Sequence, residues 1–167
     1  INYDIHYHKC NETLRECFYE GKWNYEQCRK HSIFVSQATY PVKGFHLLMK
    51  AMPKILQHYP DTMVYVGGSN IMSTRHLVDR IKRNYYGQFL KNVIKENGVQ
   101  NHVVFLGSLN ADEMKAQYLT ANAFVSCSSI ENSPNSVGEA MLLGTPVIAS
   151  NVGGTSSIIE NTSEGIL

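Results

Sequence analysis

Two glutamates eight positions apart, Glu131 and Glu139, are the residues of this chain whose type and spacing best suit chemistry. On a single helix, eight residues would separate them by about 12 Å. Pro134 lies between them, however, and proline is tolerated only in the first turn of a helix. We therefore expect Glu131 in a loop and Glu139 in the first turns of the helix that follows.

The apolar run of residues 123–127, just before this loop, predicts a buried parallel strand. A strand, a polar loop and a helix commonly form a ligand crevice at the carboxyl edge of an open α/β sheet. The N–H groups near Asn135 and Ser136 would face this crevice, where a helix N-terminus suits a phosphate. The glutamates would accept hydrogen bonds from hydroxyl groups. This combination is the chemistry of a site for a nucleotide-sugar.

A longer motif makes this interpretation more specific, since a lone glutamate at a helix N-terminus is usually only a favourable partner of the helix dipole. Across residues 131–154, Glu-x7-Glu is followed by Ala-Met, by Gly-Thr-Pro-Val-Ile-Ala-Ser and by Gly-Gly. The segment resembles the donor site of retaining GT-B glycosyltransferases of the group 1, family 4 type. The resemblance extends over residues 32–167 and implies the C-terminal, donor-binding half of such an enzyme.

The resemblance implies a role for each candidate residue. Glu131 and Lys43 would be catalytic, with Glu131 on the transferred sugar and Lys43 neutralising the leaving diphosphate. Glu139 would bind the ribose hydroxyls, and the backbone amides of Asn135 and Ser136 would bind the diphosphate. The other expected substrate-binding residues are Ser133, Asn132, Gln37, Ser108 and Leu109, the last two lying where the family holds its base. The Gly-Gly pair Gly153–Gly154 would let the chain turn closely past the site.

Two positions depart from the family pattern. Gln37 stands where the family often has an arginine six residues before the lysine. A bidentate phosphate clamp is therefore lost, and Lys43 and the helix are expected to carry more of the charge. Ser157 stands where family members usually have a glutamate, so the contact made there is not carried over.

The elements that must position these residues alternate regularly from Ser32 onward. Strands are predicted at 33–36, 62–66, 102–106, 123–127 and 146–149, and helices at 44–58, 74–96, from Asn110 onward, and at 135–143. Asn110 and Glu113 form a capping-box pattern, and Gly98 is a C-terminal stop. Pro53 and Gly87 are expected to kink, break or split their helices. The pattern predicts an α/β fold with a doubly wound, Rossmann-like parallel sheet, one half of a GT-B fold.

Residues 1–31 are expected to be a connector with a short helix around Leu14, Cys17 and Phe18. Residues 32–167 would be the donor-binding domain, truncated at both ends relative to a full enzyme. The acceptor, whether glycan, lipid or another molecule, would be bound by a missing N-terminal domain. The chain alone is therefore expected to be inactive.

Composition and charge argue against several other kinds of protein and site. The net charge is +1, from 15 Lys and Arg against 14 Asp and Glu, and no basic run suggests nucleic acid. No apolar stretch approaches the roughly 18 residues of a membrane span, so membrane contact is expected only through the missing part. The four cysteines form no CxxC pair, which favours a reducing, cytoplasmic location. The potential ligands His6, His8 and Cys10 lack a fourth partner, so no metal is expected.

The expected activity is retaining, metal-independent transfer of a sugar from a nucleoside diphosphate, UDP or GDP, with no further cofactor. The motifs G-x-G-x-x-G, G-x-x-x-x-G-K-[ST] and G-x-S-x-G are absent, which argues against dehydrogenases, P-loop proteins and hydrolases. Two alternatives stay open from the sequence: a nucleotide-sugar epimerase of the same fold, and a non-catalytic module that binds nucleotide.

Overall fold

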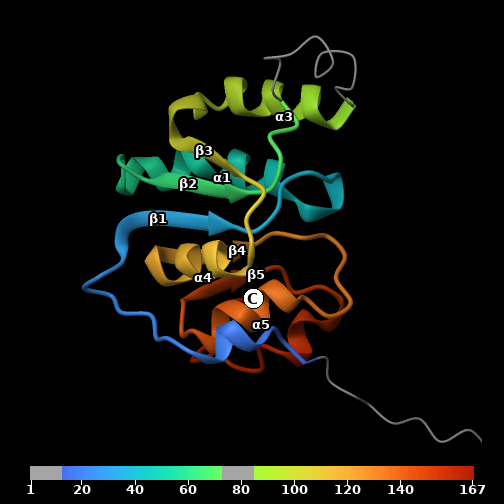
Figure 1. The fold of residues 1–167 in the computed structure, drawn as a ribbon. Helices are drawn as coiled ribbons and strands as arrows, with labels where there is room; N and C mark the ends of the chain where they lie inside the picture. Colours follow the sequence, from blue (N-terminus) through green and yellow to red (C-terminus); the bar gives the residue numbers. More distant parts are fainter. Residues whose placement is uncertain (1–12, 73–84) are drawn as a thin grey trace, which may run out of the picture.

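A five-stranded parallel sheet forms the centre of the molecule, in a computed structural model that describes residues 13–72 and 85–167 (Figure 1). The strands are β1 (Arg29–Val35), β2 (Met63–Gly67), β3 (Val103–Gly107), β4 (Ala121–Ser126) and β5 (Val147–Ala149). Their order is β3-β2-β1-β4-β5, and every neighbouring pair is parallel. The chain thus winds outward from β1 to β3 and then returns to the other side of β1. The predicted doubly wound α/β fold is confirmed.

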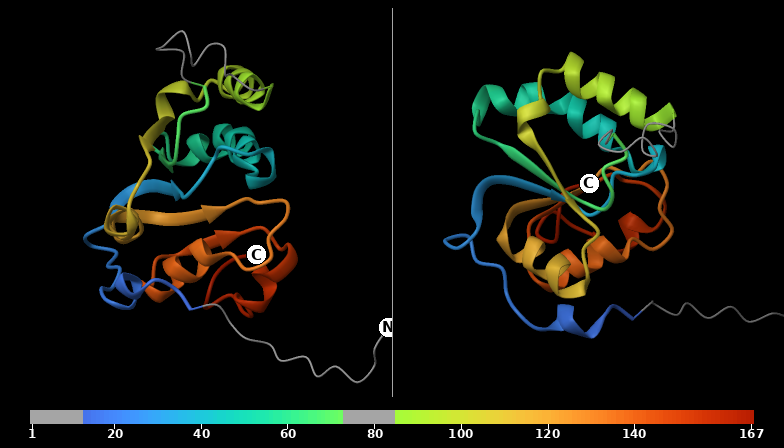
Figure 2. Two further views of the ribbon diagram at one scale, coloured as in Figure 1. Left: turned by 45° about the vertical axis from the view of Figure 1, so that its right-hand side comes forward. Right: turned by 45° about the horizontal axis from the view of Figure 1, so that its top comes forward.

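Helices cover both faces of the sheet (Figures 1 and 2). One face carries α1 (Phe45–His58) and α3 (Tyr85–Glu96), and the other carries α4 (Ala111–Thr120) and α5 (Asn135–Leu142). Each face has its own hydrophobic core. The first joins Val64 and Val66 of the sheet to Met49 and Leu90, and the second surrounds Tyr118 on α4. Short 3-10 turns η1 (Glu16–Tyr19), η2 (Pro41–Lys43), η3 (Gln100–His102) and η4 (Gly153–Ser157) lie in the connections.

Neither Pro53 nor Gly87 breaks its helix in the described part of the chain. The helix α1 runs without a break through Pro53, and Gly87 lies inside α3 rather than splitting it. Both helices bury one apolar face against the first core, for example at Met49 and Met52 of α1 and at Leu90 of α3. This burial outweighs the local cost of proline or glycine. Residues 74–84 of the expected helix 74–96 lie outside the described residues.

Two local signals are confirmed. Asn110 caps α4 with a full capping box: its side chain accepts from the Glu113 N–H at 2.9 Å, and the Glu113 carboxylate accepts from the Asn110 N–H at 2.8 Å. Gly98 follows the end of α3 with a φ of +67°, the left-handed conformation that glycine adopts at little cost.

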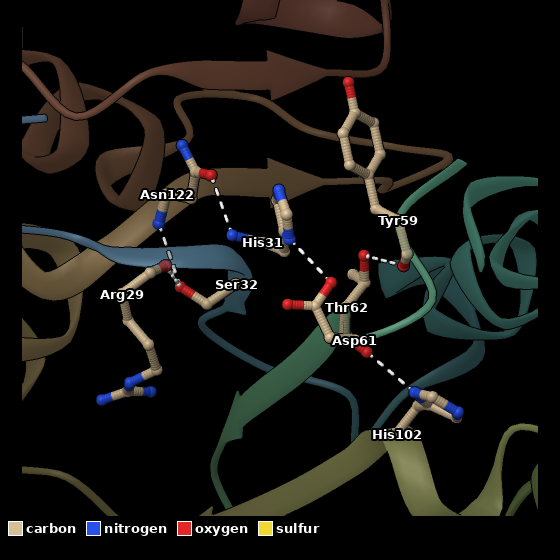
Figure 3. A network of polar contacts seen from close by, with 8 residues as sticks. All are labelled: Arg29, His31, Ser32, Tyr59, Asp61, Thr62, His102 and Asn122. Atoms are coloured by element: carbon tan, nitrogen blue, oxygen red, sulfur yellow. Dashed lines mark hydrogen bonds and ion pairs between the residues drawn. The ribbon is translucent and has the colours of Figure 1, made fainter. Parts of the chain in front are cut away.

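The first strand begins earlier than expected, at Arg29 rather than Ile33. His31 has a φ of +52°, and the pairing of β1 with β4 shifts register across it. Its N–H group donates to the Asn122 side chain at 3.0 Å, and its ring contacts Asp61 at 2.7 Å (Figure 3). The His102 ring donates to the Thr62 carbonyl at 2.9 Å in the same network. Side chains thus stabilise a bulge at the amino ends of the strands, far from their carboxyl edge.

The segment before β1 packs onto the α4 and α5 face (Figure 2). The short helix expected there is the 3-10 turn η1, and Phe18 within it is fully buried against Tyr118. Leu14 lies beside Gly138 of α5, so close that even a methyl group on that glycine would meet it. Trp23 donates its backbone N–H to Leu143 O at 2.7 Å. Residues 14–23 therefore belong to the same packed unit as the sheet.

Candidate functional site

A cavity of about 560 Å³ opens at the carboxyl edge of the sheet. It lies where the strand order reverses between β1 and β4, the position at which open α/β sheets bind ligands. Its walls come from segments that follow β1, β2, β3 and β4 and from the start of α5. Nine of the ten residues singled out from the sequence line it: Gln37, Lys43, Ser108, Leu109, Glu131, Ser133, Asn135, Ser136 and Glu139. Asn132 is exposed and is not among the lining residues; its carbonyl faces Gly154.

The two glutamates occupy the expected elements. Glu131 lies in the loop after β4, α5 begins directly after Pro134, and Glu139 is the fifth residue of this helix. The Asn135 N–H is already engaged, donating to Ser133 O at 3.0 Å, so an anion would have to compete for it. Ser136 is in the first turn, where N–H groups have no intrahelical acceptor and the helix dipole favours negative charge.

The two residues expected to be catalytic contact each other. Lys43 Nζ lies 2.5 Å from Glu131 Oε1, and Ser128 Oγ donates to the same oxygen at 2.7 Å. The side chains are only 29% and 14% exposed, so the pair is partly shielded from solvent. An anion entering the cavity would offer Lys43 a second partner, and Glu131 would then be released for a different one.

Close contact between backbones brings Lys43 to this position. Gly44 has a φ of +66°, and a Cβ atom there would lie 1.8 Å from Cys127 O. The Ser129 N–H donates to Val42 O at 2.8 Å, which joins the loop after β1 to the loop after β4. The Cys127 thiol donates to Lys43 O at 3.5 Å. Burial raises the pKa of this thiol, so it is a protonated donor rather than a nucleophilic thiolate.

The Gly-Gly pair holds the other side of the Glu131 loop. A Cβ atom at Gly153 would lie 1.7 Å from Glu131 O, and one at Gly154 would lie 1.8 Å from Asn132 O. The Gly154 N–H donates to Glu131 O at 3.1 Å. The predicted close turn of this pair past the site is therefore confirmed. Ser157, at the position of the family's glutamate, donates its hydroxyl to Gly154 O at 2.7 Å within the same turn.

Glu139 has a partner that the sequence did not reveal. Arg15, from the segment before η1, donates to Glu139 Oε1 from both Nε and a terminal nitrogen, at 2.9 and 2.8 Å. The buried Tyr118 hydroxyl donates to Oε2 at 3.4 Å. Burial, the Glu139 charge and this hydrogen bond raise the pKa of Tyr118, an effect that Arg15 partly offsets. Tyr118 therefore stays protonated at neutral pH.

Arg15 lies 124 positions from Glu139, and no spacing rule links the two. Other lining residues that the sequence did not single out include Ser126, Ser128 and Met114. The end of the buried strand β4 was the available signal for Ser126 and Ser128, because residues at that edge face the crevice. Nothing local distinguishes Met114.

The potential metal ligands His6, His8 and Cys10 lie outside the described residues. Within residues 13–72 and 85–167, no group of three or more His, Cys, Asp or Glu side chains could hold a metal ion. Cys17, Cys28 and Cys127 are free thiols. None of the helices in the described part of the chain is long and apolar enough to cross a membrane.

A doubly wound domain with its cavity at the reversal of strand order is the architecture of one half of a GT-B glycosyltransferase, and the solved structures that the chain resembles are of this class. Sucrose-phosphate synthase from Thermosynechococcus elongatus superposes with a TM-score of 0.64 at 26% identity, over 81% of this chain and 31% of that chain. Anabaena HepE, solved in complex with UDP and glucose, superposes with a TM-score of 0.65 at 24% identity, over 82% of this chain and 34% of that chain.

The family model of glycosyl transferases group 1 matches residues 22–167, and the chain belongs to this family. An uncharacterized glycosyltransferase of Methanocaldococcus jannaschii is 36% identical over 137 residues, which are 82% of this chain and 31% of the relative. The chain spans about a third of the length of the curated relatives it matches.

Proposed function

We propose that this chain is the donor-binding domain of a retaining glycosyltransferase and binds a nucleoside-diphosphate sugar, with UDP or GDP as the nucleotide. One observation carries the proposal: the Lys43–Glu131 pair, the N-terminus of α5 and Glu139 all border a single cavity. Its volume of about 560 Å³ falls within the roughly 300–1,000 Å³ of small-molecule sites. The complex of HepE with UDP and glucose supports a nucleotide-sugar as the ligand class.

The order of groups along the cavity suggests how such a ligand lies. Glu139 would accept hydrogen bonds from the ribose, and the first turn of α5 with Lys43 would bind the diphosphate. Glu131 would contact the sugar once Lys43 moves its ammonium group from this carboxylate to the phosphates. Lys43 and the helix dipole would stabilise the departing diphosphate without a metal ion. The acceptor would be held by a domain outside this chain.

The proposed location is the cytoplasm, as expected from the sequence, and free thiols at Cys17, Cys28 and Cys127 fit that proposal.

Binding and turnover by this chain alone test the proposal. Calorimetry with UDP, GDP and ADP should show weak binding to at least one of them, and less to the matching nucleoside, because the diphosphate supplies most of the charge contacts. Incubation with the nucleotide-sugar should give no transfer to an added acceptor. Robust transfer by this chain alone would contradict the two-domain arrangement. With the intact protein, an epimerised rather than a transferred sugar would favour the epimerase alternative.

The glutamates should differ in what they bind. Glu139→Ala is expected to weaken binding of the nucleoside diphosphate about tenfold, because a charged acceptor for the ribose is lost. Glu131→Ala should change the affinity for the nucleoside diphosphate by less than about threefold. Glu131 is assigned to the sugar, and its loss frees Lys43 for the phosphates. Titration of both variants with the same nucleoside diphosphate makes the comparison. Equal losses in the two variants would refute this division of roles.

A further inference from the structure

The contact between Arg15 and Glu139 lies on the wall of the cavity. Both residues line it, yet their exposure differs: the Arg15 side chain is 49% exposed and the Glu139 side chain only 5%. The Arg15 guanidinium also lies over the Phe18 ring, 4.7 Å from its centroid. Because Phe18 is fully buried and Leu14 packs beside α5, the backbone on both sides of Arg15 is anchored. The segment therefore delivers a fixed guanidinium to the cavity.

Counting donors and acceptors shows what this pair still offers a ligand. A carboxylate has about four lone-pair sites, and a guanidinium has five N–H donors. Arg15 fills two sites on Oε1, and Tyr118 fills one on Oε2 with a long bond of 3.4 Å. Glu139 thus keeps about one acceptor site, on Oε2, and Arg15 keeps about three donors on its exposed side. Hydroxyl groups suit such a pair, since a hydroxyl can both donate and accept a hydrogen bond.

We propose that Arg15 is a nucleotide-binding residue that acts together with Glu139 to recognise the ribose hydroxyls. The inference rests on the proposed function of the cavity. Glu139 accepts a hydrogen bond from one hydroxyl, and Arg15 donates to a hydroxyl oxygen while keeping the carboxylate oriented. A nearly buried carboxylate without a cationic partner would be costly, so Arg15 also makes Glu139 available as an acceptor. The pair would favour ribonucleotides over deoxyribonucleotides.

The test is the ratio of affinities for a ribonucleotide and its 2′,3′-dideoxy counterpart, measured on the same preparation of the intact protein. We would titrate UDP, GDP and ADP, keep the one that binds best, and compare it with its dideoxy form. This ratio does not depend on the folded fraction, because both ligands bind the same folded molecules. The variants are Arg15→Ala and Arg15→Lys. The control is Arg29→Ala, which removes an exposed arginine that lies over the Tyr65 ring and is not among the lining residues of the cavity.

The unchanged protein should prefer the ribonucleotide by about tenfold or more, as expected for hydrogen bonds to charged groups. Arg15→Ala should reduce this preference to within about threefold, and binding of the dideoxy form should change little. Arg15→Lys should retain part of the preference, since it keeps the charge but not the fork. Arg29→Ala should leave the ratio unchanged.

Three outcomes would overturn the inference while leaving the proposed function intact. The preference could survive in Arg15→Ala, both ligands could weaken equally, or the ribonucleotide could bind more tightly once Arg15 is removed. The last result would mean that Arg15 competes with the ribose for Glu139. Failure of the unchanged protein to bind UDP, GDP and ADP would instead contradict the proposed function itself.

Discussion

Replacing Gly44 by alanine is expected to lower the free energy of unfolding by about 3 kcal/mol. The left-handed conformation of this residue, with a φ of +66°, costs a side chain about 1–2 kcal/mol. In addition, the new Cβ atom would lie 1.8 Å from Cys127 O, a backbone atom that cannot turn aside. The loop that carries Lys43 must therefore move away from β4, and diphosphate binding should weaken as well. Urea unfolding and calorimetry measure the two effects.

Gly98 provides a matched control for this change. Its φ of +67° is almost the same, but nothing lies within 4 Å of a Cβ atom built there. Gly98→Ala should therefore cost only the conformational strain, about 1–2 kcal/mol, and should leave diphosphate binding unchanged. Equal losses of stability in the two variants would show that the close approach to Cys127 contributes nothing.

Most of the fold could be predicted because its signals are local. Three examples are the capping box at Asn110, the glycine stop at Gly98 and the helix start after Pro134. Each of these signals depends only on residues a few positions apart in the sequence. The alternation of apolar runs with helical periods then sets the order of strands and helices. Pro53 and Gly87 show the limit of this reasoning, since burial of a helix face overrides the local preference.

In the candidate site, too, some residues could be found from the sequence and others depend on three-dimensional packing. Glu131 and Glu139 were found because the motif of residues 131–154 places them in the loop and the helix that follow a predicted strand, at the edge where open α/β sheets bind ligands. Lys43 was found through the resemblance to the family, and the cavity brings it to the same edge. Arg15 was not found, because its position depends on how Phe18 packs against Tyr118 across a long stretch of sequence. The direct contact between Lys43 and Glu131 also depends on three-dimensional packing.

This contact bears on how the charge of Lys43 is used. Its ammonium group lies on Glu131, and Gln37 lines the same cavity without a charge of its own. A diphosphate would carry more negative charge than one carboxylate, so it should attract Lys43 away from Glu131. Glu131 would then face the sugar only when the diphosphate is in place. In the proposed function, the ion pair would thus link occupation of the phosphate position to the availability of Glu131.

Lys43→Ala should therefore weaken diphosphate binding by about 1.5–3 kcal/mol, roughly tenfold to a hundredfold, while nucleoside binding barely changes. Calorimetry with a nucleoside diphosphate and its nucleoside measures both. The control is Lys54→Ala, which removes an exposed lysine of α1 that is not among the lining residues of the cavity. Adding Gln37→Arg to Lys43→Ala should restore part of the affinity, because arginine forks onto phosphate oxygens from the same cavity wall.

The dependence of the affinity on salt concentration gives an independent test of the role of the Lys43 charge. The affinity for the diphosphate should fall as ionic strength rises, and it should fall less steeply in Lys43→Ala, because one cation no longer takes part. Lys54→Ala should keep the slope of the unchanged protein. If Lys43→Ala binds diphosphate and nucleoside as the unchanged protein does, with the same dependence on salt, then Lys43 serves only to neutralise Glu131. The phosphates would in that case be bound by the N-terminus of α5, and the assignment of the loop after β1 to the donor site would be wrong.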